Sequence, residues 1–237
     1  MLPGWYSHVR KQHPYTPIAF GDFGMSEDAK QWCQERGTLI EASKIPSYLP
    51  PPLHEIGWLY NGKKWTCKNT AYHPDRFVFF RKPYLMQQSP FDRTIWLDLD
   101  CQVLKSLKHL VSIPLSTNQF AICIAQPKHR FFMRATEDLQ KKLQPETIAV
   151  LCYNSGVVVF EKKSPLLDVW SYLVTHAGHN FGYDDHVLSF AINYYHFNVT
   201  LIPSRYNWPI HCRPNANAAV IHWMKDAPKH ALRLIYR

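Results

Sequence analysis

Glycine is scarce in this sequence, with 9 glycines among 237 residues, against an average usage of roughly 7%. Neither glycine-rich phosphate-binding pattern, G-x-x-x-x-G-K-[ST] or G-x-G-x-x-G, occurs. Such loops hold phosphates through backbone N–H groups, so a Walker-type ATPase and an ordinary dinucleotide-binding oxidoreductase are disfavoured. A phosphate bound by this chain would have to be held by a metal ion and cationic side chains.

Closely spaced cysteines and long apolar runs are also absent. None of the 6 cysteines forms a C-x-x-C pair, which argues against a zinc site or a redox dithiol. We expect reduced, mostly buried thiols in a cytoplasmic protein. No signal peptide follows Met1, and the longest uncharged, histidine-free stretch, residues 110–127, contains proline and polar residues. The sequence therefore predicts no membrane span.

The chain is rich in apolar residues and in positive charge. Hydrophobic residues make up 46% of it, enough for a sizeable core, so disorder is not expected. The net charge of +9 favours anionic partners. Beyond residue 200, Asp226 is the only acid among several basic residues. One hypothesis is peripheral association with an anionic membrane, and the alternative is ordinary solvated side chains. No nucleic-acid-binding motif occurs, so nucleic acid is not an expected partner.

Short apolar strands alternate with amphipathic helices, which is typical of an α/β sheet. Residues 44–64 form a proline-rich connection, and loops of that kind on an α/β scaffold often carry functional residues. Pro83 is expected to kink or interrupt one helix. Strands are predicted at 17–20, 38–41, 94–97, 119–125, 155–160, 199–202 and 218–222, and helices at 5–12, 26–36, 69–88, 134–143, 166–177 and 184–193.

Two aspartates follow the most apolar of these strands. Residues 95–100 read Ile-Trp-Leu-Asp-Leu-Asp, and alternate residues of a strand share a face, so Asp98 and Asp100 are expected to point the same way. Ligands of open α/β sheets bind where strands end. Two adjacent carboxylates need a cation between them, and oxygen ligands favour Mg²⁺ or Mn²⁺. The alternative is a pair of acids that cap nearby backbone.

Three later segments place polar groups at the ends of predicted elements. His222 could complete a metal shell, and Lys225 could meet phosphate oxygens, although a core histidine and a solvated lysine are the plainer interpretations. Residues 154–156 read Asn-Ser-Gly and could form a simple turn. Residues 182–186 place two acids at a helix start, where N-capping alone would explain one of them.

In this order, the segments resemble the motifs of GT-A glycosyltransferases, closest to glycosyltransferase family 8, the glycogenin and lipopolysaccharide galactosyltransferase type. Residues 81–100 resemble its helix and D-x-D strand, and residues 153–160 its F-N-S-G strand. Residues 183–188 resemble its D-Q-D helix start, and residues 221–225 its late I-H-F segment. The resemblance implies one GT-A (Rossmann-like) α/β domain over residues 1–237, with a mostly parallel mixed sheet and helices on both faces.

The resemblance also implies a reaction. A hexose would pass from a nucleotide diphosphate sugar, with a UDP-sugar expected, to a glycan or other acceptor, with retention of configuration. Mn²⁺ (or Mg²⁺) would sit on the diphosphate, held by Asp98, Asp100 and His222. Lys225 would contact the phosphates, and Arg81 or Lys82 would brace the donor. Asn154 and Asp184 would contact the transferred sugar, with Asp185 nearby. Ser155 and Gly156 would also bind the substrate.

The sequence departs from the family pattern in two places. Asp185 and His186 stand where the family has Gln and Asp, and the glycine of the late segment is absent. The chain also begins near a first helix, where the family has a preceding strand that contacts the nucleotide base, so either that strand is missing from the chain or the base is held differently. These departures favour, as a second hypothesis, a sugar- or nucleotide-sugar-binding protein on the same fold that has lost catalysis.

Overall fold

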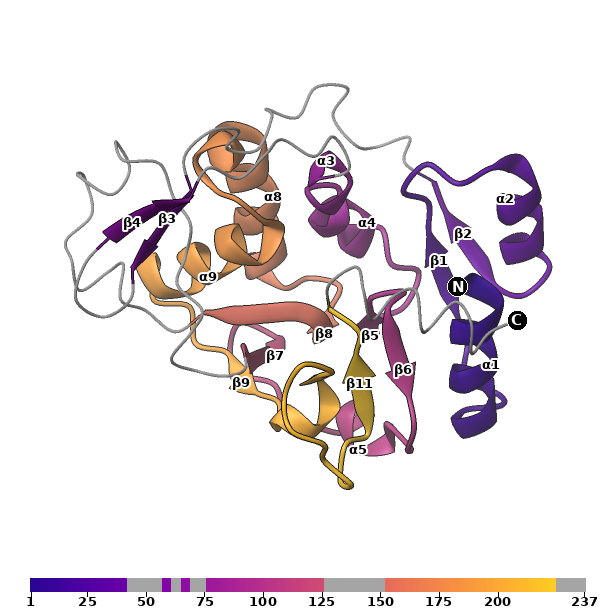
Figure 1. Ribbon diagram of the computed structural model, residues 1–237. Coiled ribbons are helices and arrows are strands. Elements are labelled where there is room, and N and C mark those ends of the chain that lie inside the picture. The colour runs from indigo at the N-terminus through magenta and orange to yellow at the C-terminus, as the bar shows by residue number, and fades with distance from the viewer. Residues whose placement is uncertain (42–56, 61–64, 69–75, 126–151, 225–237) are drawn as a thin grey trace.

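The computed structural model describes residues 1–41, 57–60, 65–68, 76–125 and 152–224 (Figure 1). The helix predicted at 134–143, much of the connection at 44–64, and Lys225 lie outside the described residues.

The chain begins with a helix and a small β-α-β unit. Helix α1 (Leu2–Gln12) precedes β1 (Ala19–Gly21), α2 (Glu27–Gln34) and β2 (Thr38–Ile40), and the two strands pair in parallel. Ser26 caps α2, since its side chain accepts a hydrogen bond from the Ala29 N–H. This β-α-β unit and helix α1 lie together at one side of the molecule in Figure 1.

A four-stranded mixed sheet forms the centre, in the order β5 (Arg93–Leu97), β8 (Tyr153–Glu161), β7 (Phe120–Ile124) and β9 (Thr200–Leu201). Strand β8 is antiparallel to both β5 and β7, and β9 is parallel to β7. All residues of β8 except the last are buried. Such a strand must be covered on both faces, which explains its run of valines.

The two faces of this sheet carry two apolar clusters. Val158 and Phe160 pack with α8 (Pro165–Ala177) and α9 (Asp184–Tyr194), above β8 in Figure 1. Val157 and Val159 point the other way, into a cluster that includes Trp5 of α1 and Val220. The side chains of β8 alternate between the two clusters and so contact the layers on both faces of the sheet. The predicted α/β class with a mixed sheet is confirmed.

A second sheet places the late part of the chain against the end of β5. Strand β11 (Val220–His222) lies between β6 (Cys101–Val103), to which it is antiparallel, and β10 (Trp208–Pro209), to which it is parallel. In this register Cys101 and His222 are direct partners. The other described elements are β3 (Gly57–Tyr60), β4 (Trp65–Lys68), α3 (Arg76–Phe79), α4 (Lys82–Gln87), α5 (Lys108–Val111), η2 (Gly178–Asn180) and η3 (Ser204–Tyr206).

Several predicted boundaries need correction. The helix predicted over 69–88 is divided, in its described part, into α3 and α4, and Pro83 lies in the first turn of α4, as an interruption there would require. Strand β8 starts at Tyr153 rather than Ser155, so residues 154–156 belong to a buried strand and not to a turn. Strand β3 of the antiparallel pair β3–β4 lies within residues 44–64, which were predicted as a connection without a strand.

Candidate functional site

The two aspartates of the D-x-D segment lie in a tight turn between β5 and β6. Strand β5 ends at Leu97, and the Cys101 N–H donates to the Asp98 carbonyl at 2.9 Å. Because the turn breaks the strand alternation, the two carboxylates have different partners. The carboxylate of Asp98 accepts from Trp96 Nε1 at 2.7 Å and lies 3.0 Å from Lys82 Nζ. Asp100 Oδ1 lies 3.2 Å from His222 Nε2.

Lys82 is the centre of a buried polar cluster. Its ammonium lies 3.0 Å from Asp98 Oδ2 and 3.1 Å from Asp184 Oδ2, and it donates to Ser155 Oγ at 2.9 Å. Ser155 in turn donates to Asp184 Oδ2 at 2.9 Å. Burial alone would lower the pKa of Lys82, but Asp184 and Asp98 raise it well above its ordinary value. Lys82 is therefore a permanent cation that ties α4, β5, β8 and α9 together.

The start of α9 carries two carboxylates in different settings. Burial raises the pKa of Asp184, with Lys82 opposing the shift. Burial also raises the pKa of Asp185 to about 6, again against the pull of Lys82. Asp185 Oδ1 is buried and has no hydrogen-bond partner within the described part of the chain. It can accept a hydrogen bond from a ligand, whereas Asp184 is already engaged by Ser155 and Lys82.

His222 is held by two asparagines on the side away from Asp100. Its Nδ1 lies 2.9 Å from Asn207 Oδ1 and 3.1 Å from Asn154 Oδ1. Asn154 Oδ1 also accepts from the Gly156 N–H at 3.0 Å. Two oxygens at one ring nitrogen require that nitrogen to carry a proton. In the neutral ring Nε2 then faces the Asp100 carboxylate with its lone pair, and in the charged ring Nε2 donates to that carboxylate.

Gly156 is required by the closeness of this imidazole. A Cβ atom at position 156 would lie 2.2 Å from His222 Cε1 and 2.5 Å from Nδ1. No side chain fits there without displacing the ring. In the Asn-Ser-Gly segment, Asn154 thus contacts the imidazole, Ser155 contacts Lys82 and Asp184, and Gly156 leaves the space that the imidazole occupies.

The residues around His222 fit a divalent cation. Among the described residues, the atoms of Asp100, Cys101 and His222 that could bind a metal lie within 4.8 Å of one another. In the neutral ring, Nε2 and Asp100 Oδ1, 3.2 Å apart, set two lone pairs against each other, and a cation between them would turn that repulsion into coordination. Burial raises the pKa of the Cys101 thiol, which donates to the Gly156 carbonyl. Asp100 and His222 are therefore the better-suited ligands.

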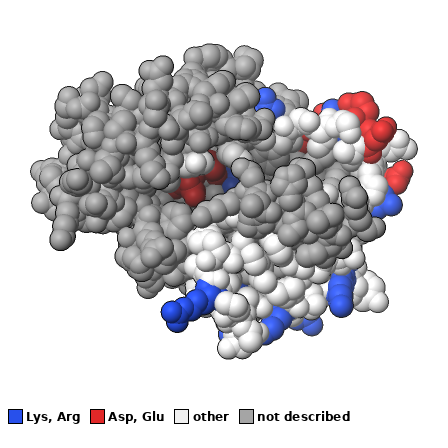
Figure 2. All heavy atoms as spheres, in the orientation of Figure 1, with Lys and Arg blue, Asp and Glu red and all other residues white. Residues whose placement is uncertain are grey.

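The structure brings most of the predicted site residues together. In Figure 2, acidic and basic side chains lie together in a hollow near the middle of the face shown. Asp98 is outside the Asp100–His222 group and contacts Lys82 instead. Arg81 is the half-buried residue that opens α4, next to Lys82. Sequence reasoning missed Trp96, which its i, i+2 spacing to Asp98 could have shown, and Asn207, for which no sequence signal exists.

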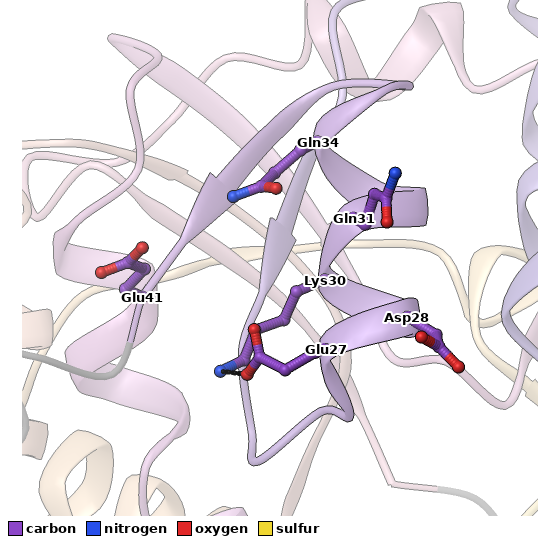
Figure 3. Close-up of a pocket in the computed structure, with 6 residues that line it drawn as sticks. All are labelled: Glu27, Asp28, Lys30, Gln31, Gln34 and Glu41. Carbon is purple, nitrogen blue, oxygen red and sulfur yellow. Dashed lines mark hydrogen bonds and ion pairs between the residues drawn. The ribbon is translucent and has the colours of Figure 1, made fainter.

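A separate hollow of about 380 Å³ lies along α2 and the end of β2, lined by Glu27, Asp28, Lys30, Gln31, Gln34 and Glu41 (Figure 3). Lys30 pairs there with Glu27 at 2.9 Å and with Asp22 at 3.6 Å. These residues belong to other elements than those that carry Lys82, Asp184 and His222. The hollow is thus no part of the candidate site.

Solved structures of glycosyltransferases resemble this structure over almost its whole length. The galactosyltransferase LgtC, in complex with donor and acceptor sugar analogues, matches 95% of this chain and 83% of its own, with a TM-score of 0.59 and 17% identity. Mouse xyloside xylosyltransferase 1 matches 93% of this chain and 90% of its own, with a TM-score of 0.55 and 11% identity. The chain has the GT-A fold of glycosyltransferases.

GlyE of Streptococcus pneumoniae TIGR4 matches 94% of this chain and 51% of its own, with a TM-score of 0.57 and 13% identity. No family model and no curated protein sequence matches the chain. At these identities the likeness establishes the fold, as the sequence motifs predicted.

Two further predictions concern cysteines and membranes. Cys33, Cys101, Cys123 and Cys152 are buried free thiols, as expected, and Cys212 is half-buried. None of the described helices combines the length and the apolar character that a bilayer crossing requires. The cytoplasmic location and the peripheral membrane association stay predictions.

Proposed function

We propose that this protein is a glycosyltransferase that uses a nucleotide diphosphate sugar, with a UDP-sugar as the expected donor, and a divalent cation bound by Asp100 and His222. The observation that carries the proposal is the closeness of His222 Nε2 to Asp100 Oδ1, 3.2 Å away, beside the Lys82 cluster on a GT-A fold. A metal-bound diphosphate fits this place, since the chain has no glycine-rich phosphate loop.

The residues divide the work between the leaving group and the sugar. Mn²⁺ or Mg²⁺, when bound, would neutralise charge that develops on the departing diphosphate. Lys82 holds Asp98 and Asp184 in place by its two ion pairs. Asp184 is positioned to stabilise positive charge on the transferred sugar, as a carboxylate does in glycoside hydrolysis. Asp185 Oδ1 is available to accept a sugar hydroxyl. Retention of configuration follows from the family resemblance.

A second candidate function is binding of a sugar or nucleotide sugar without transfer. The observation that favours it is the engagement of Asp184 Oδ2 by both Lys82 and Ser155, which leaves that oxygen little capacity for a substrate. Turnover separates the two functions.

The test is calorimetric titration of UDP into the protein with Mn²⁺, with EDTA, and in the Asp100→Asn variant. Asp168→Asn is a matched control, because Asp168 lies on α8 and pairs with Gln87. We expect binding that needs both the metal and Asp100. Hydrolysis or transfer from a panel of UDP-sugars then indicates a transferase, and binding without turnover indicates the second function. No UDP binding by a folded sample contradicts the proposed transferase, because its expected donor is a UDP-sugar.

A further inference from the structure

Asn207 is a buried residue between η3 and β10 that sequence reasoning did not single out. Only 4% of its surface is exposed. Its Nδ2 donates to the Asn154 carbonyl oxygen at 3.3 Å and to Asn154 Oδ1 at 2.7 Å. These two bonds identify the nitrogen end of the Asn207 amide, so its oxygen is the atom that faces His222 Nδ1 at 2.9 Å.

The same bonds identify the oxygen of Asn154. Asn154 Oδ1 receives the Gly156 N–H and the Asn207 amide, and it also lies 3.1 Å from His222 Nδ1. Neither oxygen can donate, so the Nδ1 proton of His222 is the one donor that satisfies both. Of the two asparagines, Asn207 makes the shorter contact to the ring and spans from β8 to β11.

We propose that Asn207 is a positioning residue that fixes the Nδ1–H tautomer and the ring orientation of His222, and so presents Nε2 to a divalent cation shared with Asp100. The inference rests on the metal site of the proposed function. Partners of this kind are general in metal sites, and their loss weakens metal binding about 10- to 100-fold. The amide nitrogen of Asn207 donates two hydrogen bonds to Asn154, and its oxygen accepts from the imidazole. Asn207 therefore acts on the metal site through His222.

The first experiment needs no substrate and no metal. Nitrogen-15 NMR of the histidine rings in the metal-free protein, at a pH where imidazoles are neutral, reports the tautomer of His222. We expect the Nδ1–H form in the wild type and a shift towards a mixture of both tautomers in Asn207→Ala. An Nε2–H form in the folded wild type overturns the proposal.

The second experiment measures Mn²⁺ affinity by calorimetry without nucleotide. Asn207→Ala is expected to bind Mn²⁺ about 10- to 100-fold more weakly than the wild type. The control Asn193→Ala removes an amide of α9 that donates to the Ser189 carbonyl, and it is expected to bind Mn²⁺ as the wild type does. Asn207→Asp keeps an oxygen for the His222 N–H but loses both bonds to Asn154. It therefore separates the effect of Asn207 on the tautomer from its effect on packing against β8.

The outcomes distinguish this inference from the proposed function. If Asn207→Ala does not fold, Asn207→Asp takes its place, and we expect it to keep the Nδ1–H tautomer and to bind Mn²⁺. Equal Mn²⁺ affinity in the wild type and a folded Asn207→Ala overturns the role of Asn207 and leaves the metal site standing. A wild type that binds no Mn²⁺ removes the metal site, and the role of Asn207 with it.

Discussion

At the scale of the residue, Lys82 is the cation on which two buried ion pairs of the site depend. One buried ammonium meets two carboxylates, so its loss leaves both acids without a counter-charge. Removing one partner of a buried ion pair typically destabilises a protein by about 3–5 kcal/mol. We expect a loss of that size in Lys82→Met, measured by urea unfolding.

The control for that substitution is Lys30→Met. Lys30 also pairs with two acids, Glu27 and Asp22, but on the open surface of α2. We expect little change in its unfolding free energy. A Lys82→Met protein that is as stable as Lys30→Met would show that the buried cluster contributes nothing to folding.

Gly156→Ala tests the tight space beside His222. The added methyl group would overlap the ring, so we expect a destabilisation of about 1–3 kcal/mol together with a loss of Mn²⁺ affinity. Gly24→Ala is the control, because Gly24 has a φ of +104° with no atom near its Cβ position. It is expected to lose stability but keep metal binding. Unchanged Mn²⁺ affinity in Gly156→Ala would mean that the ring can move freely.

The buried carboxyl of Asp185 predicts a pH effect. Burial raises its pKa to about 6, so the folded protein binds this proton more tightly than the unfolded chain, and ionisation above about pH 6 opposes folding. The difference from an ordinary value of 3.8 corresponds to at most about 3 kcal/mol. Relative to the wild type, metal-free Asp185→Asn should gain stability as the pH rises from about 4 to about 7. A constant difference in unfolding free energy over that range would contradict the raised pKa.

At the scale of the element, strands with an apolar pattern in their own sequence could be predicted. Pairings between strands that lie far apart in the sequence could not. Strands β5 and β8 contain the apolar runs Ile95–Leu97 and Val157–Phe160, so their pattern was visible in the sequence. Strand β11 was predicted within 218–222, but β6 and β10 have only three and two residues, too short for a period to appear. The pairing of β11 with β6 alone brings Asp100 beside His222.

The residues of the site also differ in how far the sequence predicts them. His222 and the two aspartates of the D-x-D segment have a local motif, and the sequence found them. The separate partners of Asp98 and Asp100 depend on the turn that the Cys101 N–H closes on the Asp98 carbonyl, and strand alternation does not foresee such a turn. Asn207, which follows η3, reaches Asn154 of β8 and His222 of β11 through tertiary contacts that have no local sequence pattern.

Helix α1 is attached to the loop after β6 by a histidine. His13 Nε2 accepts the Leu107 N–H at 2.8 Å, a role that requires a neutral ring. Burial and then Lys108 lower the pKa of His13. Since the unfolded chain binds this proton more tightly, the contribution of His13 is complete above its ordinary pKa of 6.5 and is lost as the pH falls below it.

We therefore expect the wild type to lose more stability than His13→Gln between about pH 7.5 and pH 5.5, as measured by urea unfolding. His176→Gln, which changes an exposed ring of α8, is the control and should follow the wild type. If His13→Gln and the wild type lose stability equally, the bond to Leu107 does not depend on the charge of the ring.

At the scale of the whole molecule, the candidate site joins α4, the β5–β6 turn, β8, α9 and β11. A metal that binds only this folded arrangement stabilises it, by about 2.7 kcal/mol at a hundred times its dissociation constant. For a chain of this length that corresponds to roughly 5–10 °C in the melting temperature. We expect Mn²⁺ to raise the melting temperature relative to EDTA in the wild type and not in His222→Ala. An equal rise in both proteins would place the ion elsewhere.

The pairing of Cys101 with His222 also has a consequence for biosynthesis. A protein is made from its N-terminus, and its early parts fold first. Strand β6 emerges early but has no partner until β11 follows, and the imidazole of the site arrives with that strand. A growing chain can therefore pair β1 with β2, and later β5 and β7 with β8, while it still lacks His222. The proposed metal site becomes complete only after β11 has been made, so a chain that stops before residue 220 would have a partial sheet and no site for the cation.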